Sequence, residues 1–469
     1  MGEAPRPIVI GAGPAGMACA YTLAQAGRPA QVIERDEEPG GLCRTLDFNG
    51  YLFDIGGHRF LSKSEEVNAL WQRVMKSDML RVRRLSRIYF HKRFFNYPLS
   101  FFNTCWNLGP WESLRCLASY AQAMLFRPGD DRTFEGWIIN HFGRRLYEIF
   151  FKTYTEKVWA VVCKDISADW ATQRIRGLSL RVAMAAIFFR QKGTPKTLAE
   201  EFLYPKTGPG EFYNRLERIL SGLGTEMTYK TAVTGLRHEG SRVQTLILEK
   251  RPLGRQREIA ADFVFSTMPL PLLVKALIPA APPEVLEAAA QLKFRSFLVV
   301  NVILNREYVF PDQWLYIQDP AVRLGRIQNY KNWSPAMTVD LKKTSLGLEY
   351  FCTQDDDLWR MNDVDLIDFA VAELEKIRLA HRRELINGFV VRRANVYPVY
   401  SLDYERHVAV LRRYLEKFEN LCTLGREGLF RYDNSDHALL TGMYAARNYL
   451  GLGAYDVWNV NTEKVYLET

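Results

Sequence analysis

The chain has 469 residues and a formal net charge of +9, with 48% hydrophobic and 25% charged side chains. These values are those of an ordinary globular protein of two or three domains, and they exclude a disordered chain. In a protein of this size the charge excess is weak evidence for nucleic acid, and no zinc-finger or RNA-binding signature occurs. We therefore expect no nucleic-acid partner.

Seven cysteines are scattered along the chain without a CxxC pair, and the seven histidines are equally dispersed. This pattern is typical of reduced thiols in a cytoplasmic protein, and no cluster has the spacing of a metal site. No signal-peptide leader begins the chain, and no apolar run approaches the ~20 residues that span a bilayer. The nearest run, at 180–192, is short and flanked by basic residues. The prediction is a cytoplasmic protein without a metal ion or a transmembrane segment.

Residues 6–35 are predicted to form a strand, a glycine turn, a helix and a second strand. Gly11, Gly13 and Gly16 have GxGxxG spacing, in which the first glycine permits a tight turn and the second lets the backbone approach a pyrophosphate. The third glycine permits close packing of the helix on the strand. Glu34 ends the second strand, where a carboxylate can bind a ribose hydroxyl. The pattern predicts dinucleotide binding but does not distinguish NAD, NADP and FAD.

The rest of the chain alternates between helical and strand patterns. Residues 65–195 are predicted to be mostly helical, although the basic run at 81–95 is interpreted as a solvated, strand-like face rather than a phosphate patch. Residues 224–267 and 293–352 have strand patterns, and two helices follow. The chain closes with a strand, LCTLGREG, and a helix, HALLTGMYAARNYLG.

Three glycine-containing segments favour a flavin. EPGGLCRT, directly behind Glu34, resembles the second flavin-binding fingerprint of the glutathione-reductase-type FAD family, which NAD-only domains lack. LGREGLFRYDNSDHALLTG resembles the closing flavin motif of the same superfamily, and FDIGGHRF brings a second glycine pair toward the flavin ring. The resemblance implies FAD held by the following residues: Gly11, Gly13, Pro14, Ala15, Gly16, Glu34, Arg35, Gly41, Leu42, Arg44, Gly56, Gly57, His58, Arg426, Asn434 and Asp436.

The expected fold is α/β, with a glutathione-reductase-type FAD-binding Rossmann-like domain, a helical insertion and a mainly β-sheet substrate domain. The FAD-binding domain is expected in three pieces, 1–75, 196–270 and 388–469. The helical insertion is expected at 76–195 and the substrate domain at 271–387.

Seven blocks of sequence resemble, in the same order, blocks of the UDP-galactopyranose mutases within the amine oxidase and protoporphyrinogen oxidase superfamily. They are IGGH, NYPLSFFN, EKVWAVVCKDISADWATQRI, YPKTGPGEFYNRL, VRLGRIQNYKNWSP, VYPVY and GREGLFRYDNSDH. The resemblance implies a flavoenzyme that isomerises the pyranose and furanose rings of a nucleoside-diphosphate sugar. In that family N5 of the reduced flavin attacks the anomeric carbon, and no net redox change occurs.

The same resemblance assigns roles in the site. Arg174 and Arg323 correspond to a pair of arginines that clamps the leaving diphosphate, and Tyr330 and Tyr397 to tyrosines that hydrogen-bond to it. Such groups stabilise the negative charge that develops on the leaving group. His58 corresponds to a loop histidine that lies against the flavin.

The expected uracil pocket differs from that of the family. Leu99, Ser100 and Thr155 stand where an aromatic, a glutamine and an asparagine are expected, and Tyr97 alone is kept. A site that loses its hydrogen-bonding partners for a base no longer selects that base strongly. Another base, a pyrophosphate carried on a lipid, and a substrate with no nucleotide therefore all stay open, as does the sugar.

A second function remains as an alternative. An FAD-dependent oxidase or dehydrogenase acting on an amine, a sugar or a lipid predicts an apolar or aromatic cavity, and the aromatic-rich segment 94–126 keeps this alternative alive. No second GxGxxG indicates a dedicated NAD(P)H domain, so the reductant, NAD(P)H or another donor, stays open. The oligomeric state is equally open.

Overall fold

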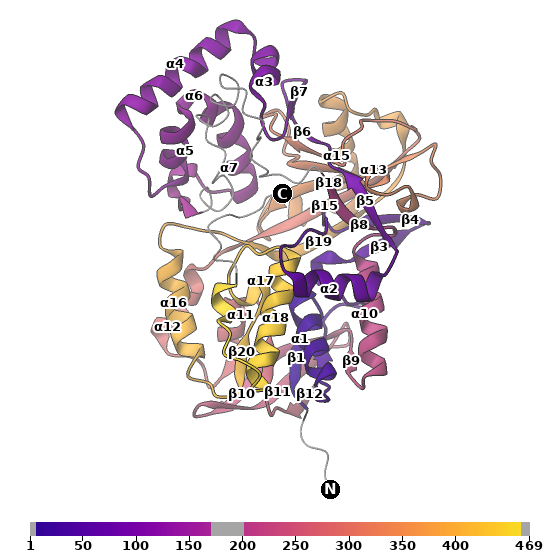
Figure 1. The fold of residues 1–469 in the computed structure, drawn as a ribbon, viewed down its shortest axis with the longest axis vertical. Helices are drawn as coiled ribbons and strands as arrows, with labels where there is room; N and C mark the ends of the chain where they lie inside the picture. Colours follow the sequence, from indigo (N-terminus) through magenta and orange to yellow (C-terminus); the bar gives the residue numbers. More distant parts are fainter. Residues whose placement is uncertain (1–5, 170–200, 461–469) are drawn as a thin grey trace.

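The computed structural model describes residues 6–169 and 201–460, so Arg174 and the apolar run at 180–192 lie outside the described residues. Figure 1 shows three parts: an α/β unit below, in indigo and yellow, a helical layer above it, and a large β-sheet beside that layer. The chain passes repeatedly between these parts.

A five-stranded parallel sheet forms the centre of the α/β unit. Strand β1 (Ile8–Ile10) leads through the glycine turn into α1 (Pro14–Gln25), and β2 (Gln31–Ile33) follows, which confirms the predicted order over residues 6–35. The other strands are β9 (Glu226–Thr228), β13 (Val264–Ser266) and β20 (Leu421–Thr423), and the sheet order is β20-β13-β1-β2-β9. The central strands are almost wholly buried. One face of the sheet shares a core with helices, and the opposite face shares a core with a pair of strands at 231–250.

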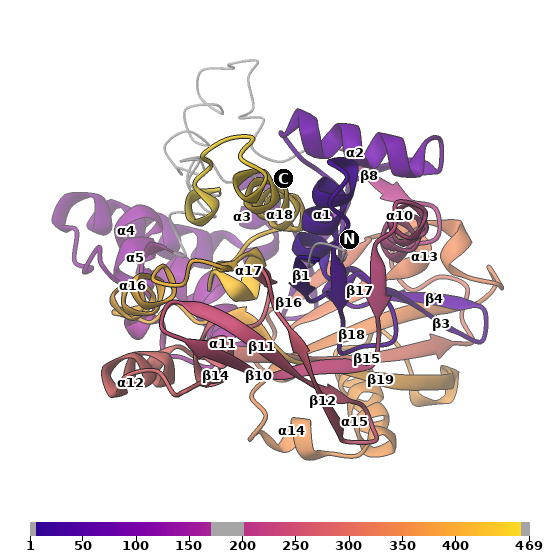
Figure 2. The ribbon, with the colours of Figure 1, turned by 90° about the horizontal axis from the view of Figure 1, so that it is seen from below.

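Helix α18 (Ser435–Tyr449) lies along α1 in both views (Figures 1 and 2). Glycines make this close approach possible, because a Cβ on Gly442 would lie 2.0 Å from the Ala15 carbonyl oxygen. On its other side α1 contacts α10 (Gly210–Gly222), against which α2 (Glu65–Met75) packs. Segments from both ends of the described chain therefore complete one unit.

A seven-stranded sheet forms the second part. Its strands, in spatial order, are β19 (Leu385–Pro398), β15 (Phe294–Leu304), β18 (Thr344–Cys352), β17 (Arg326–Asn329), β16 (Trp314–Ile317), β6 (Ser86–Phe90) and β7 (Arg93–Asn96). Helix α15 (Asp363–Lys376) packs on β15 and β19. Strand β6 pairs in parallel with β16 and antiparallel with β7, so residues 86–96 belong to this sheet although they precede the helical layer.

Shorter elements connect the two sheets. They are β3 (Thr45–Phe48), β4 (Tyr51–Asp54), β5 (Met79–Arg83), β8 (Glu201–Pro205), β10 (Thr231–Glu239), β11 (Arg242–Lys250), β12 (Arg255–Ala260), α11 (Leu270–Lys275), β14 (Leu277–Ile278), α12 (Pro283–Gln291), α13 (Tyr330–Trp333), α14 (Asp357–Arg360), α16 (Tyr404–Leu415) and α17 (Gly425–Gly428). Figure 2 shows β10, β11 and β12 in a separate sheet, of which β14 is the fourth strand.

The helical layer is the third part. It contains α3 (Phe101–Leu108), α4 (Pro110–Phe126), α5 (Phe134–Phe142), the short α6 (Arg144–Leu146), a π-helical turn at Tyr147–Lys152, and α7 (Thr153–Trp159). Lys157 on α7 donates hydrogen bonds to the carbonyl oxygens of Ile317, Asp319 and Leu324, which joins the layer to the seven-stranded sheet. In the described part of the chain, no helix is long and apolar enough to cross a membrane.

Candidate active site

One cavity of about 1010 Å³ runs between the three parts of the molecule. At one end it is lined by the glycine turn before α1, and at the other by side chains of α3 to α7. The closing segment between α17 and α18 lines its middle, opposite residues of β16, β17 and β19. The cavity therefore joins the glycine turn, which is the expected nucleotide-binding end, to the helical layer.

The glycine turn has the geometry that a dinucleotide requires. Gly11 has a φ of +97°, and a Cβ there would lie 2.1 Å from the Thr267 hydroxyl oxygen. A Cβ on Gly13 would meet nothing within 4 Å, so the backbone at this position is open to the cavity. Gly16 lies beneath the turn, where a Cβ would be 1.9 Å from the Gly11 carbonyl oxygen. This geometry fits the role expected for each glycine from its spacing.

The carboxylate of Glu34 is hydrogen-bonded to the backbone of the glycine turn. Its carboxylate accepts hydrogen bonds from the backbone N–H of Ala12 at 2.6 Å and of Asp36 at 2.9 Å. Burial raises the pKa of this carboxyl group, and the two backbone hydrogen bonds oppose that shift. Glu34 and Arg35 both line the cavity, whereas Arg44 does not and instead forms an ion pair with Asp36 at 3.5 Å. Arg44 therefore contacts Asp36, which lines the cavity, and does not line the cavity itself.

His58 follows the second glycine pair and lines the middle of the cavity with Gly56 and Gly57. Its Nε2 lies 3.0 Å from the Ile55 carbonyl oxygen, and its Nδ1 lies 3.8 Å from the Cys43 sulfur. A carbonyl oxygen only accepts, so Nε2 carries the proton and Nδ1 accepts from the thiol. Burial lowers the pKa of His58 to about 4, so the ring is neutral at physiological pH.

The closing segment brings Arg426 to the cavity wall. Its Nε donates to the Val396 carbonyl oxygen and its Nη1 to that of Asp433, both at 3.1 Å. Its Nη2 is buried and has no hydrogen-bond partner among the described residues. Beside it, Asn434, Ser435 and Asp436 line the cavity at the start of α18. This end of the helix directs backbone N–H groups and positive potential toward the cavity.

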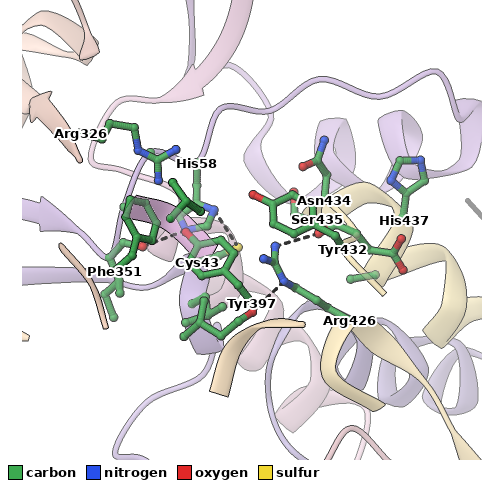
Figure 3. A pocket seen from close by; sticks show the side chains of 18 of the residues that line it. Cys43, His58, Arg326, Phe351, Tyr397, Arg426, Tyr432, Asn434, Ser435 and His437 are labelled. Carbon is green, nitrogen blue, oxygen red and sulfur yellow. Dashed lines mark hydrogen bonds between the residues drawn. The ribbon is translucent and has the colours of Figure 1, made fainter. Parts of the chain in front are cut away.

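Aromatic rings and one arginine form the opposite wall (Figure 3). Tyr397 stacks on Tyr432 with ring centroids 5.7 Å apart, and the Arg426 guanidinium lies 4.1 Å from the Tyr432 centroid. Burial raises the pKa of Tyr397 to about 12, so its hydroxyl stays protonated and can donate. Arg326 points into the cavity toward His58.

Arg326 is held by a buried carboxylate. Its Nε donates to Glu349, which also accepts from the Gln328 amide nitrogen at 2.8 Å. The β17–β18 register aligns Arg326 directly with Glu349, and side chains alternate along β17, so Arg326 and Gln328 share the cavity face. The two terminal nitrogens of Arg326 are left for an anion in the cavity.

Two predicted substrate residues are not in the cavity wall. Arg323 lies before β17, is partly exposed, and pairs with Asp357 at 2.7 Å. Tyr330 is fully buried in the core and donates its hydroxyl proton to the Asp54 carbonyl oxygen at 2.7 Å. Arg326, three residues after Arg323, does line the cavity, whereas Tyr330 packs in the core. Arg174, the other predicted arginine, lies outside the described residues.

The predicted positions of base recognition do lie at the cavity. Tyr97, Leu99 and Ser100, before α3, line it together with Thr155 of α7. From there an apolar arm extends into the helical layer, lined by Phe101, Cys105, Leu108, Cys116, Leu117, Phe134, Phe142, Leu146, Phe150 and Phe151. This apolar arm contrasts with the polar wall around Arg326.

The sequence profile of the flavin-containing amine oxidoreductases matches residues 14–403, which is most of the chain. The chain belongs to this family. Its fold also superimposes on a crystal structure of reduced UDP-galactopyranose mutase with a TM-score of 0.84 and 21% identity, over 98% of this chain and 96% of the other. The α/β fold class predicted from the sequence is confirmed.

The curated sequence relatives match over shorter stretches of the chain. A Klebsiella pneumoniae protein named "Probable UDP-galactopyranose mutase" is 26% identical over 173 residues, which are 34% of this chain and 43% of that protein. Human all-trans-retinol 13,14-reductase is 42% identical over 59 residues, 13% of this chain and 10% of the reductase. The matches thus cover less than half of the length of these curated relatives.

The family implies FAD, and the residues present fit this cofactor. The open backbone at Gly13 and the start of α1 would hold the pyrophosphate, and Glu34 lies where the ribose would bind. The unpartnered Nη2 of Arg426 supplies a donor where the flavin end would lie. Bound flavin would supply either hydride acceptance or, when reduced, a nucleophilic nitrogen.

Several cavity residues were not predicted from the sequence. Arg326 and Tyr432 fall inside blocks that already resembled the mutases, and alternation along a strand could have favoured Arg326. Arg59, Lys63 and Tyr316 also line the cavity, and no spacing in the sequence indicated them.

Proposed function

We propose that this flavoenzyme is a sugar-nucleotide mutase that isomerises the ring of a nucleoside-diphosphate sugar with reduced FAD. The observation that carries the proposal is Arg326, whose side chain reaches the cavity beside Tyr397 and Tyr154. A leaving diphosphate carries negative charge, and an arginine with adjacent hydroxyl donors stabilises that charge as it develops.

The surroundings of these groups support the same role. Glu349 orients Arg326 through its Nε, and the pKa of Tyr397, raised to about 12 by burial, keeps its hydroxyl a donor over the physiological pH range. Tyr154 lines the same wall, and burial raises its pKa well above the ordinary value. The neutral His58 adds no charge beside the flavin. These residues bind and orient an anion rather than abstract a proton.

The compartment and the reductant belong to the same proposal. All seven cysteines lie in described segments and are free thiols, which supports a reducing cytoplasm. NAD(P)H or another donor would reduce the flavin before turnover.

The test is anaerobic turnover with a panel of nucleotide sugars, beginning with UDP-galactose, after dithionite reduction of the flavin. We expect a furanose isomer of unchanged mass from the reduced enzyme only, detected by chromatography and NMR. Arg326→Lys should lower kcat/KM by roughly 100-fold or more, since one transition-state donor pair is lost. Arg323→Lys is the matched control, and its kcat/KM should equal that of the wild type.

A second candidate is an FAD-dependent oxidoreductase that acts on a lipid, an amine or a sugar. The apolar arm favours it, because eight of its ten side chains are phenylalanine or leucine and the other two are cysteine, which suits a hydrocarbon substrate. Bleaching of the oxidised flavin by such a substrate, with no isomer from any nucleotide sugar, would replace the mutase proposal with this one.

A further inference from the structure

The outer face of α3 and α4 carries large apolar side chains that are exposed. Trp106 is 87% exposed and Trp111 71%, and they are joined by Phe102, Leu114, Leu125 and Phe126. Isolated exposed apolar residues are common, but six large ones on two consecutive helices favour an interaction surface. We call these six residues the apolar patch.

The patch follows the helical periodicity of α4. Trp111, Leu114, Ala118, Ala121 and Leu125 are spaced by three or four residues, so they lie along one side of the helix, and all are exposed. The acidic residue of α4, Glu112, is turned toward Arg145 and Arg115 in ion pairs. A helix that is apolar on both its inner and outer sides is typical of one that contacts hydrocarbon.

Basic residues border the patch. Arg93, on β7, donates to the Asn107 carbonyl oxygen at the end of α3, and Lys92 precedes it. Neither forms an ion pair with a carboxylate among residues 6–169 and 201–460. At the other end of α4, Arg127 pairs with Asp131. Exposed cations at the edge of an apolar face complement anionic lipid headgroups.

The inner side of the same two helices lines the apolar arm of the cavity. Leu117 belongs to both surfaces, because it is 39% exposed and also lines the cavity. The arm therefore reaches the surface beside the patch. One layer of helices carries the apolar patch on its outer side and lines the apolar arm on its inner side. A folded protein partner would cover the patch but would not explain this continuity.

We propose that the apolar patch docks on a bilayer that contains anionic lipids, and that the apolar arm receives the hydrocarbon chain of a lipid from that bilayer. The tryptophans would lie at the headgroup level, where an indole ring has an apolar face and a polar N–H. This inference is independent of the reaction proposed above, because docking can be measured without turnover.

The first test is co-sedimentation of the full-length, FAD-loaded protein with vesicles of phosphatidylcholine, with and without phosphatidylglycerol. We expect binding to the anionic vesicles that weakens with added salt. Trp106→Ser combined with Trp111→Ser should lower the partition coefficient by about 10-fold or more, since two exposed indoles lose their burial. The matched control, Leu253→Ser with Val364→Ser, removes two exposed apolar side chains elsewhere and should bind like the wild type.

The second test addresses the arm. Parinaric acid, a fluorescent fatty acid, should bind the wild type, and Leu117→Asp should weaken its binding by about 10-fold because a charge then lies at the mouth of the arm. The FAD content of this variant should stay unchanged. A wild type that binds neither vesicles nor the fatty acid overturns the inference. A dimer that becomes a monomer in the double tryptophan variant, without vesicle binding, also overturns it and makes the patch a subunit interface.

Discussion

Two buried ionisable side chains, Asp54 and His58, lie four residues apart and shift in opposite directions. Burial raises the pKa of Asp54 from 3.8 to about 7, although hydroxyls of Tyr204 and Thr45 donate to its carboxylate. Burial lowers the pKa of His58 from 6.5 to about 4. In both cases loss of water disfavours the charged form. The pKa of Asp54 rises because its deprotonated form is charged, and the pKa of His58 falls because its protonated form is charged.

The first prediction concerns the pH dependence of stability. Between about pH 4 and 7 the folded state holds the Asp54 proton more tightly than the unfolded state, so this group lowers the free energy of unfolding as pH rises. His58 acts oppositely, since between about pH 4 and 6.5 the unfolded state binds the extra proton. Asp54→Asn should therefore gain stability relative to the wild type as pH rises to 8, by roughly 4 kcal/mol at most.

Urea unfolding at pH 5 and pH 8 measures this difference. Asp47→Asn, on the paired strand β3, is the matched control, because Asp47 is exposed and should give the same difference at both pH values. A pH-independent difference for Asp54→Asn would contradict the assigned shift.

At the scale of single elements, the turn between β1 and α1 contains one glycine that the packing of the protein requires and another that is open to the cavity. A Cβ on Gly16 would press on the rigid Gly11 carbonyl group, whereas a Cβ on Gly13 would enter open cavity space. The same substitution thus meets protein at one position and cofactor at the other.

The second prediction uses this contrast. Gly16→Ala should lower the stability of the protein without cofactor by about 1–3 kcal/mol or more, because the helix must move off the strand. Gly13→Ala should leave that stability unchanged and reduce the flavin content after purification, because its methyl group occupies the pyrophosphate position. Thermal unfolding of the cofactor-free protein and flavin absorbance measure the two effects. Equal Tm values for the two variants would contradict the assigned roles.

Most helices and strands could be predicted from the sequence, but the contacts between them could be predicted less often. The strand–turn–helix–strand order at the start of the chain and the helices after residue 100 could be predicted because periodicity and glycine spacing are local signals. The pairing of β6 with β16 could not, because it joins residues more than 200 positions apart. Arg323 and Arg326, in contrast, are close in the sequence, and their spacing does not say which of them faces the cavity. Only the register of β17 with β18 shows that it is Arg326.

At the scale of the whole molecule, the cavity contacts all three parts of the structure. A ligand that fills its nucleotide-binding end touches β1, α1, the closing segment and residues of the seven-stranded sheet together. Binding there should stabilise the folded chain as a unit, since the ligand binds the native state and not the unfolded one.

The third prediction follows from this coupling. FAD added to the cofactor-free protein at about 100 times its Kd should stabilise the fold by roughly 2.7 kcal/mol and raise Tm measurably. NAD is the control ligand, and at the same concentration it should leave Tm unchanged. A Tm shift with NAD equal to that with FAD would contradict the assignment of a flavin.

The contact between α1 and α18 also has a consequence for biosynthesis. Translation delivers α1 long before α18, yet the wall of the cavity needs both. Until α18 has left the ribosome the nascent polypeptide cannot close this wall, so we expect flavin insertion only after that point. A prematurely terminated product would expose the uncovered side of α1 and become a substrate for cellular proteases.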